Sequence, residues 1–157
     1  MYVDEMKIGV STDKTNHLKT EQIVNGLRQR YSPEDITMFA LPFVSRPSRD
    51  VLFANRPDQN TGVDTEILAS AYGIPYNYCI NGDNDIDNSA DIYVIAGAGI
   101  ISPECVKGKR IINCHPGIIP LSRCLDAFKW AIYDAVPIGI SLHYILDSVD
   151  FGEYLAI

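Results

Sequence analysis

The chain has 157 residues, of which 46% are hydrophobic, and 13 basic against 20 acidic residues give a formal net charge of −7. This length predicts a single domain over residues 1–157 with a substantial core, and the acidic balance excludes a general nucleic-acid-binding surface. The sequence has no apolar run long enough to span a membrane and no N-terminal signal peptide. We therefore expect a cytoplasmic protein with neither nucleic acid nor membrane as a partner.

Short apolar strands alternate with amphipathic helices along the chain. β-branched and aromatic residues predict strands over residues 7–11, 36–43, 74–78, 91–95, 110–114, 139–146 and 154–157. Helical spacing of apolar residues predicts helices over residues 20–30, 64–72 and 126–134. The alternation of strands and helices predicts a three-layer α/β fold with a mostly parallel central sheet.

Details within these elements give further expectations. Asp64 or Thr65 is expected near the N-cap of the second helix, and Gly73 is expected as its C-cap. The third helix is expected to turn Phe128, Ala131 and Ile132 inward, with Trp130 also in the core. The long segment over residues 45–62 is rich in Pro, Arg, Asp and Asn, and we expect a functional loop there.

Polar side chains lie at the C-terminal end of the predicted strand over residues 110–114 and directly after it. Asn113 and His115 are two residues apart, so both can point to the same side of an extended chain. In parallel α/β sheets, ligands bind beyond the carboxyl ends of the strands, which is where these side chains fall. Considered alone, Asn113 is typical of a turn and His115 of a loop, but motifs downstream favour catalysis.

Three motifs follow one another in the order residues 113–117 (NCHPG), 139–143 (GISLH) and 150–152 (DFG). This series resembles the folate-dependent formyltransferases, which carry Asn-x-His-Pro, Gly-x-Ser/Thr-x-His and Asp-x-Gly in the same order. The resemblance implies a Rossmann-like formyltransferase fold. It also implies that Asn113, His115 and Asp150 are the catalytic residues.

The chemistry of formyl transfer matches these side chains. An amide N–H and a protonated imidazole can donate to the oxyanion that forms, and a carboxylate can take the proton of the attacking amine. The resemblance implies 10-formyltetrahydrofolate as the co-substrate. The four cysteines and three histidines have no zinc-binding spacing, so we expect no metal.

The resemblance also implies which residues bind the two substrates. The expected folate-binding residues are Ala96, Gly97, Ala98, Gly99, Ile100, Ile101 and Asp147, and the expected acceptor-binding residues are Pro116, Gly117, Arg123 and His143. In this chain, Gly117 replaces the usual serine of the family, and Cys124 replaces the glycine that follows the arginine.

Structural interpretations of these residues stay open. The Gly-Ala-Gly segment fits a tight turn equally well, and Asp147 is typical of a turn. Arg123 fits a solvated loop arginine, and His143 fits a hydrogen-bonded strand residue that supports the segment holding Asp150.

The expected acceptor is a small-molecule amine, most like that of the sugar N-formyltransferases. Methionyl-tRNA formyltransferases carry an additional C-terminal nucleic-acid-binding domain, whereas this sequence is acidic and stops at Ile157, so we do not expect tRNA as the acceptor. Residues 9–16 lack the glycine-rich phosphate loop of glycinamide ribonucleotide formyltransferases, which favours a nucleotide-linked amino sugar.

Alternatives to that reaction remain. They are formylation of glycinamide ribonucleotide, hydrolysis of 10-formyltetrahydrofolate, and a non-catalytic folate- or nucleotide-binding module. Because the sequence ends soon after Asp150, we expect an exposed sheet edge and a homo-oligomer.

Overall fold

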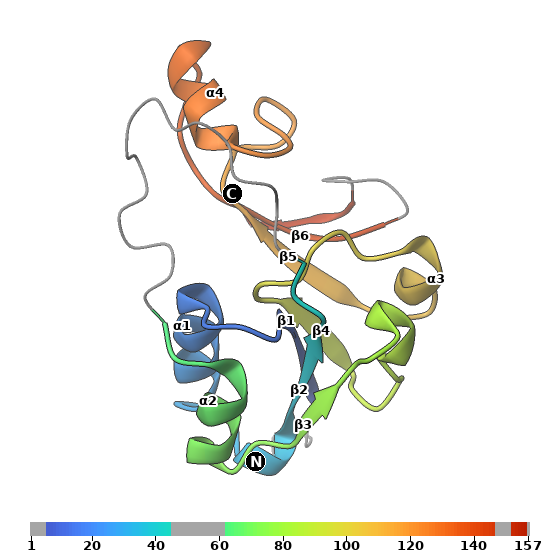
Figure 1. Cartoon of the computed structure of the whole chain (residues 1–157). Helices are drawn as coiled ribbons and strands as arrows, with labels where there is room; N and C mark the ends of the chain where they lie inside the picture. The colour runs from blue at the N-terminus through green and yellow to red at the C-terminus, as the bar shows by residue number, and fades with distance from the viewer. Residues whose placement is uncertain (1–5, 45–61, 147–151, 157) are drawn as a thin grey trace, which may run out of the picture.

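The computed structural model describes residues 6–44, 62–146 and 152–156, so nearly all of the predicted loop over residues 45–62 lies outside the described part (Figure 1). Seven strands form one sheet in the order β3-β2-β1-β4-β5-β6-β7. The elements are β1 (Ile8–Asp13), α1 (Leu18–Leu27), η1 (Pro33–Asp35), β2 (Ile36–Leu41), α2 (Thr65–Tyr72), β3 (Tyr76–Tyr78), η2 (Gly82–Asp85), β4 (Ile92–Ile95), α3 (Pro103–Val106), β5 (Ile111–His115), α4 (Ala127–Tyr133), β6 (Ser141–Tyr144) and β7 (Tyr154–Ala156), where η marks a 3-10 helix.

The sheet is mostly parallel, as the sequence predicts. The strands from β3 to β5 run parallel, whereas β6 is antiparallel to β5 and β7 is antiparallel to β6. β1 lies between β2 and β4, so the chain builds the sheet outward in both directions from β1. In open α/β sheets, this change of direction opens a crevice at the carboxyl ends of the two central strands.

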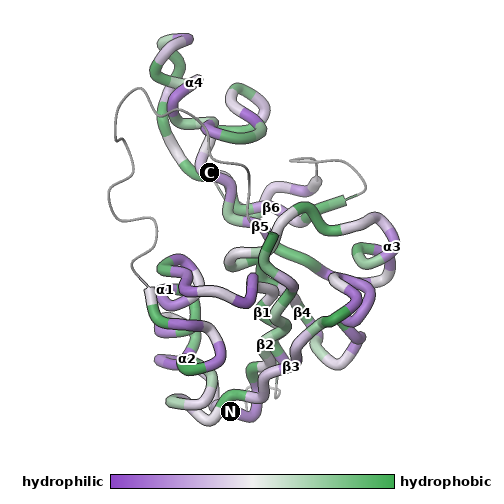
Figure 2. Tube along the Cα trace, viewed as in Figure 1, coloured by the Kyte–Doolittle hydropathy of each residue, from purple (hydrophilic) through white to green (hydrophobic). Residues whose placement is uncertain are grey.

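Helices cover both faces of the sheet and give it three layers (Figure 1). On one face, Val24 of α1 and Leu68 of α2 pack in a cluster with Met38. On the other face, Phe39 packs in a second cluster with Val106 of α3. Because side chains alternate along a strand, the adjacent residues Met38 and Phe39 enter opposite cores. Figure 2 shows the hydrophobic character of the central strands between these layers.

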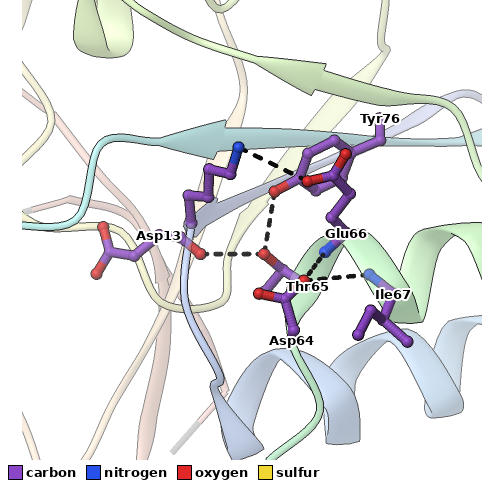
Figure 3. Close-up of polar contacts among 7 residues, drawn as sticks. Asp13, Asp64, Thr65, Glu66, Ile67 and Tyr76 are labelled. Carbon is purple, nitrogen blue, oxygen red and sulfur yellow. Dashed lines mark hydrogen bonds and ion pairs between the residues drawn. The ribbon is translucent and has the colours of Figure 1, made fainter.

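The start of α2 is tied to the ends of two strands (Figure 3). The Asp64 carboxylate caps the helix by accepting from the first-turn N–H groups of Glu66 and Ile67, at 2.9 and 3.2 Å. The Thr65 hydroxyl donates to the Asp13 carbonyl at the end of β1 and lies 3.1 Å from the hydroxyl oxygen of Tyr76 in β3. Asp64 is therefore the N-cap, and Gly73 is the C-cap as predicted.

Two helix ends adopt the left-handed conformation with different residues. Gly73 follows α2 with φ 68°, and Ala135 lies just after α4 with φ 54°. An L-residue costs about 1 kcal/mol in this conformation. We expect Gly73→Ala to lower the free energy of unfolding by about 1 kcal/mol, and Ala135→Gly to raise it by up to about 1 kcal/mol. Denaturant titration of both variants measures the two changes, and changes of the same sign would contradict the prediction.

The orientation of α4 differs from the prediction. Its buried residues are Ala127 and Ala131, so the helix packs through an alanine stripe. Ile132 is 62% exposed and Trp130 is 56% exposed, although both were expected to face inward. Phe128 is half-buried. The apolar pattern allowed two neighbouring stripes on this helix, and the stripe with the smaller side chains permits the closer approach.

Candidate active site

The register between β5 and β6 gathers polar side chains on one face of the sheet. Asn113 lies opposite His143, and His115 lies opposite Ser141. Residues directly opposite in an antiparallel pair share a face, as do residues two apart on one strand. The fold therefore places Asn113, His115 and His143 on one face of the sheet, although they come from two separate segments.

Asn113 presents an amide with no protein partner in the described structure. The residue is half-buried and is the third of the five residues of β5. Its side-chain amide makes no hydrogen bond with any residue in the ranges 6–44, 62–146 and 152–156. A half-buried amide in this state has an N–H group available for a ligand oxygen.

His115 is held firmly beneath the surface. It is 4% exposed, and its Nε2 lies 3.1 Å from the carbonyl oxygen of Ser122. Because a carbonyl oxygen can only accept, Nε2 carries the proton in this contact. The loop between β5 and α4 thus fixes the plane and orientation of the ring.

Three of the four predicted acceptor-binding residues occupy the same loop but differ in exposure. Pro116 is exposed, Gly117 is buried and Arg123 is half-buried. Gly117 has close neighbours, because a Cβ there would lie 2.6 Å from the Ser122 carbonyl oxygen. Contact of Pro116, Gly117 and Arg123 with an acceptor stays a prediction.

Cys124 has φ 67° at the place where the resembled family has glycine. This departure therefore preserves the left-handed backbone conformation that glycine adopts readily.

The segment after β4 divides into core and exposed residues. Ala96 is fully buried and Ile101 is 9% exposed, and each belongs to a hydrophobic cluster. Gly99 and Ile100 are exposed, and Ile100 reaches 85% exposure. A Cβ at position 99 would meet no atom within 4 Å, so the chain is open to a ligand there. Gly97 and Ala98 are half-buried, and contact of this segment with folate stays a prediction.

The sequence interpretation missed two residues at the start of α1, its N-cap His17 and Lys19, that reach this edge of the sheet. A Cβ on Gly97 would lie 2.6 Å from Nδ1 of His17, so the His17 ring occupies the space beside that glycine. Lys19 extends its Nζ to 3.5 Å from the Cys114 carbonyl oxygen, between the two candidate catalytic residues. The available signal was their position just after β1, because loops at strand carboxyl ends converge.

Burial changes the acid–base behaviour of the His17 and Lys19 side chains. It lowers the pKa of the His17 imidazole, and the charge of Lys19 lowers that pKa further. Burial also lowers the pKa of the Lys19 ammonium, although the nearby Cys114 opposes this shift. Burial thus favours the neutral form of each side chain, because low-dielectric surroundings disfavour charge.

His143 is fully buried beside Asn113. Its Nδ1 lies 3.0 Å from the Tyr144 carbonyl oxygen, and its Nε2 has no hydrogen-bond partner among the described residues. The expected role of His143, support of the segment that holds Asp150, stays a prediction. Asp150 and Asp147 both lie outside the described residues.

The described residues lack two features. No group of three or more His, Cys, Asp or Glu side chains there could hold a metal ion. No helix in the same ranges is long and apolar enough to cross a membrane.

Comparison with known proteins gives structural neighbours. No protein-family model matches the chain. The phosphoribosylglycinamide formyltransferase of Anaplasma phagocytophilum is similar with a TM-score of 0.62 and 20% identity, over 97% of this chain and 70% of that chain. Glycinamide ribonucleotide transformylase 1 of Symbiobacterium toebii has a TM-score of 0.66 and 17% identity, over 99% of this chain and 74% of that chain.

A sugar N-formyltransferase of a Shewanella species is also similar, with a TM-score of 0.61 and 17% identity. The match covers 96% of this chain and 55% of that enzyme, so this chain spans about half of the sugar enzyme's length. These likenesses confirm the predicted fold class, a three-layer α/β formyltransferase fold with a mostly parallel sheet.

Proposed function

We propose that this chain, which has the formyltransferase fold, transfers a formyl group from 10-formyltetrahydrofolate to a primary amine. The proposal rests on one observation, the available amide of Asn113 beside the buried ring of His115 at the carboxyl end of β5. The sequence adds Asp150 as the carboxylate of the same motif series.

Each proposed catalytic residue has a separate task. The amine nitrogen attacks the formyl carbon, and the carbonyl electron pair moves onto oxygen to give an oxyanion. The Asn113 amide and the His115 ring donate hydrogen bonds to that oxyanion. Asp150 takes the proton from the amine and delivers it, directly or through water, to the departing folate nitrogen. The oxyanion electron pair then re-forms the carbonyl group of the new formamide, and the C–N bond to folate breaks with its electron pair going to that nitrogen.

The segment after β4 suits the flat ring of a folate. Gly99 provides open space and Ile100 offers an exposed apolar side chain at the carboxyl end of a central strand. Flat aromatic ligands bind through apolar contact together with a few polar groups, and backbone groups can supply the latter. We therefore propose that residues 97–100 contact the folate, with Asp147 as a further contact.

The proposed acceptor is a nucleotide-linked amino sugar. β1 continues to Asp13, so residues 9–13 form a strand rather than a glycine-rich loop. Glycinamide ribonucleotide is the second candidate, because the structural neighbours include enzymes named for that acceptor as well as a sugar N-formyltransferase.

A tetrahydrofolate-release assay tests the proposal. Purified protein is mixed with 10-formyltetrahydrofolate and, separately, with each member of a panel of nucleotide-linked amino sugars and with glycinamide ribonucleotide. Release that requires an amino sugar supports the proposal, and release that requires glycinamide ribonucleotide supports the second candidate. Release without any amine indicates hydrolysis. Folate binding without release indicates a non-catalytic binding module.

Arg123 is expected to contribute to acceptor binding. We expect Arg123→Ala to raise the acceptor KM roughly 10- to 100-fold with a smaller change in kcat, because charged hydrogen bonds to an anionic acceptor hold substrate and transition state alike. Steady-state kinetics with the best acceptor of the panel measures both constants. Arg30→Ala, at an exposed arginine beyond α1, is the control. An unchanged acceptor KM in Arg123→Ala would remove Arg123 from the acceptor site.

We also expect self-association in solution. Large apolar side chains gather on α4 and its flanking segments, each more than half exposed: Leu125, Trp130, Ile132, Tyr133, Ile138 and Ile140. Burial of such surface favours association. At micromolar concentration, sedimentation should give a dimer or larger species for the wild type and a smaller species for Ile132→Glu. Ile67→Glu, at an equally exposed isoleucine of α2, should leave the assembly unchanged. A strictly monomeric wild type would contradict this expectation.

A further inference from the structure

The segment that joins β4 to α3 is fixed at both of its ends. At the first end, the N–H groups of Ala96 and Gly97 donate to the Ser11 carbonyl of β1, over 2.9 and 3.3 Å. At the second end, the Ile101 side chain is 9% exposed and lies in the hydrophobic cluster on the α3 side of the sheet. Ser102 follows as the N-cap of α3. The residues between these ends therefore form a short span between two anchors.

The span between the two ends, residues 98–100, offers its backbone groups to a ligand. No residue in the described part of the chain hydrogen-bonds to the backbone N–H or C=O groups of residues 98–100. Gly99 and Ile100 are exposed, and Ala98 is half-buried. Such backbone groups can pair with the polar edge of a flat heterocycle, and they bind it more tightly when their conformation is fixed beforehand. We therefore expect the affinity of this segment for folate to depend on how firmly its ends are held.

Asp83 supplies the hydrogen bond that holds the second end. Its carboxylate Oδ2 accepts from the Ser102 N–H over 2.5 Å, although the two residues are 19 apart in sequence. The Asp83 side chain is half-buried. A hydrogen bond to an ionised carboxylate is roughly twice as strong as one between neutral groups. This contact therefore ties the start of α3 to η2.

The turn that carries Asp83 is held by the same core. The Gly82 N–H donates to the Cys79 carbonyl over 3.0 Å, and the Ile86 N–H donates to the Asp83 carbonyl over 3.1 Å. Cys79 and Ile86 are 1% and 4% exposed, and both belong to the cluster that contains Ile101. The Asp83 carboxylate is therefore presented by a turn that the core fixes in place.

The neighbouring acidic side chains of this turn bond locally. The Asp85 carboxylate accepts from the Asn81 N–H over 2.8 Å, and the Asp87 carboxylate accepts from the Ser89 N–H over 3.0 Å. These bonds join residues four and two apart in sequence. Asp83 differs from both because its partner lies in another segment.

We propose that Asp83 is a positioning residue for folate binding, whose carboxylate holds the Ser102 N–H and so keeps the backbone of residues 98–100 in the conformation that receives the folate. The inference rests on the proposed function. Asp83 acts through Ser102 rather than through contact with the folate. Its loss should weaken folate binding and leave the chemical step unchanged, because Asn113 and His115 lie on a different strand.

Kinetics and calorimetry of Asp83 variants test the proposal. We expect Asp83→Ala to raise the KM for 10-formyltetrahydrofolate and the Kd for tetrahydrofolate roughly 10- to 100-fold, with kcat and the acceptor KM within about threefold of the wild type. Asp83→Asn should bind folate within about fivefold of the wild type, since its amide oxygen can still accept from the Ser102 N–H. Asp87→Ala is the control, because it removes the same charge from the same turn, and its constants should be unchanged.

Two results of these measurements would overturn the proposal. One is a folded Asp83→Ala protein with the wild-type folate constants. The other is an Asp83→Asn protein that binds folate as weakly as Asp83→Ala, because the effect would then belong to the charge and not to the hydrogen bond.

NMR of the backbone amides gives a readout that is independent of activity. The Ser102 amide proton of the wild type should resonate downfield and exchange slowly with solvent, and Asp83→Ala should lose both properties. The amides of β5 should keep their wild-type exchange rates in that variant. If Asp83→Ala does not fold, the Asp83→Asn constants and the wild-type spectrum decide, and rapid exchange at Ser102 in the wild type would overturn the proposal.

Failure of the proposed function gives a different pattern. If the Ser102 amide is protected in the wild type and unprotected in Asp83→Ala, but the wild type binds no tetrahydrofolate, the anchoring by Asp83 stands and its assignment to folate binding is refuted. If the wild type and Asp83→Ala bind tetrahydrofolate equally, the proposed function stands and this inference fails.

Discussion

Replacement of Asn113 by alanine is expected to lower kcat for formyl transfer about 100- to 1,000-fold, the usual effect of removing one oxyanion donor. The physical reason is that the hydrogen bond from the amide N–H to the formyl oxygen becomes strong only as negative charge develops on that oxygen. The half-buried Asn113 amide bonds to no described residue, so its removal should leave the thermal unfolding temperature close to that of the wild type. Stopped or continuous tetrahydrofolate-release assays, together with a thermal melt, measure both quantities.

The control for this experiment is a second strand asparagine. Asn77 lies exposed on β3, at the far edge of the sheet, and Asn77→Ala should retain wild-type turnover. Asn113→Asp keeps the size but replaces the N–H donor by a negative oxygen, so it should be at least as inactive as Asn113→Ala. Near-normal turnover of a folded Asn113→Ala protein would remove the amide from the mechanism.

The part of the site that sequence could predict depends on local order along the chain. Asn113 and His115 are adjacent in one motif, and a parallel strand delivers its carboxyl end to the ligand side of the sheet. The caps of α2 were likewise visible, since Asp64 and Gly73 act on their own helix. In these cases the interaction that fixes the structure joins residues close together in sequence.

The part that sequence could not predict depends on contacts between distant segments. Lys19 and Cys114 are 95 residues apart, and only the position of α1 over the sheet brings them together. The pairing of His115 with the Ser122 carbonyl was equally hidden, because a backbone acceptor leaves no trace in residue identity. The orientation of α4 was missed for a related reason, since the helical period does not determine which of two apolar stripes is covered.

Gly152 is a place where a local motif and a distant contact meet. It is the glycine of the motif over residues 150–152, and a Cβ there would lie 1.7 Å from the backbone oxygen of Tyr144 in β6. The adjacent residue Glu153 accepts a hydrogen bond from the Tyr144 N–H over 2.9 Å, at the start of the β6–β7 pairing. A backbone oxygen cannot yield as the end of a flexible side chain does, so this pairing requires glycine.

Gly152→Ala is therefore expected to lower the free energy of unfolding by about 1–3 kcal/mol, because the two strands must move apart or store strain. Turnover should fall as well, since Asp150 lies only two residues before Gly152 in the sequence. Gly82→Ala is the matched control, because it shares a positive φ but its Cβ meets no atom within 4 Å. The free energy of unfolding of that variant should fall by about 1 kcal/mol, and its turnover should be unchanged.

Asp150→Asn should show the opposite pattern, with stability retained and turnover lowered at least about 100-fold. Denaturant titration and the tetrahydrofolate-release assay, applied to all three variants, separate a structural loss from a catalytic one. Wild-type stability in Gly152→Ala would show that β6 and β7 tolerate a side chain at this contact.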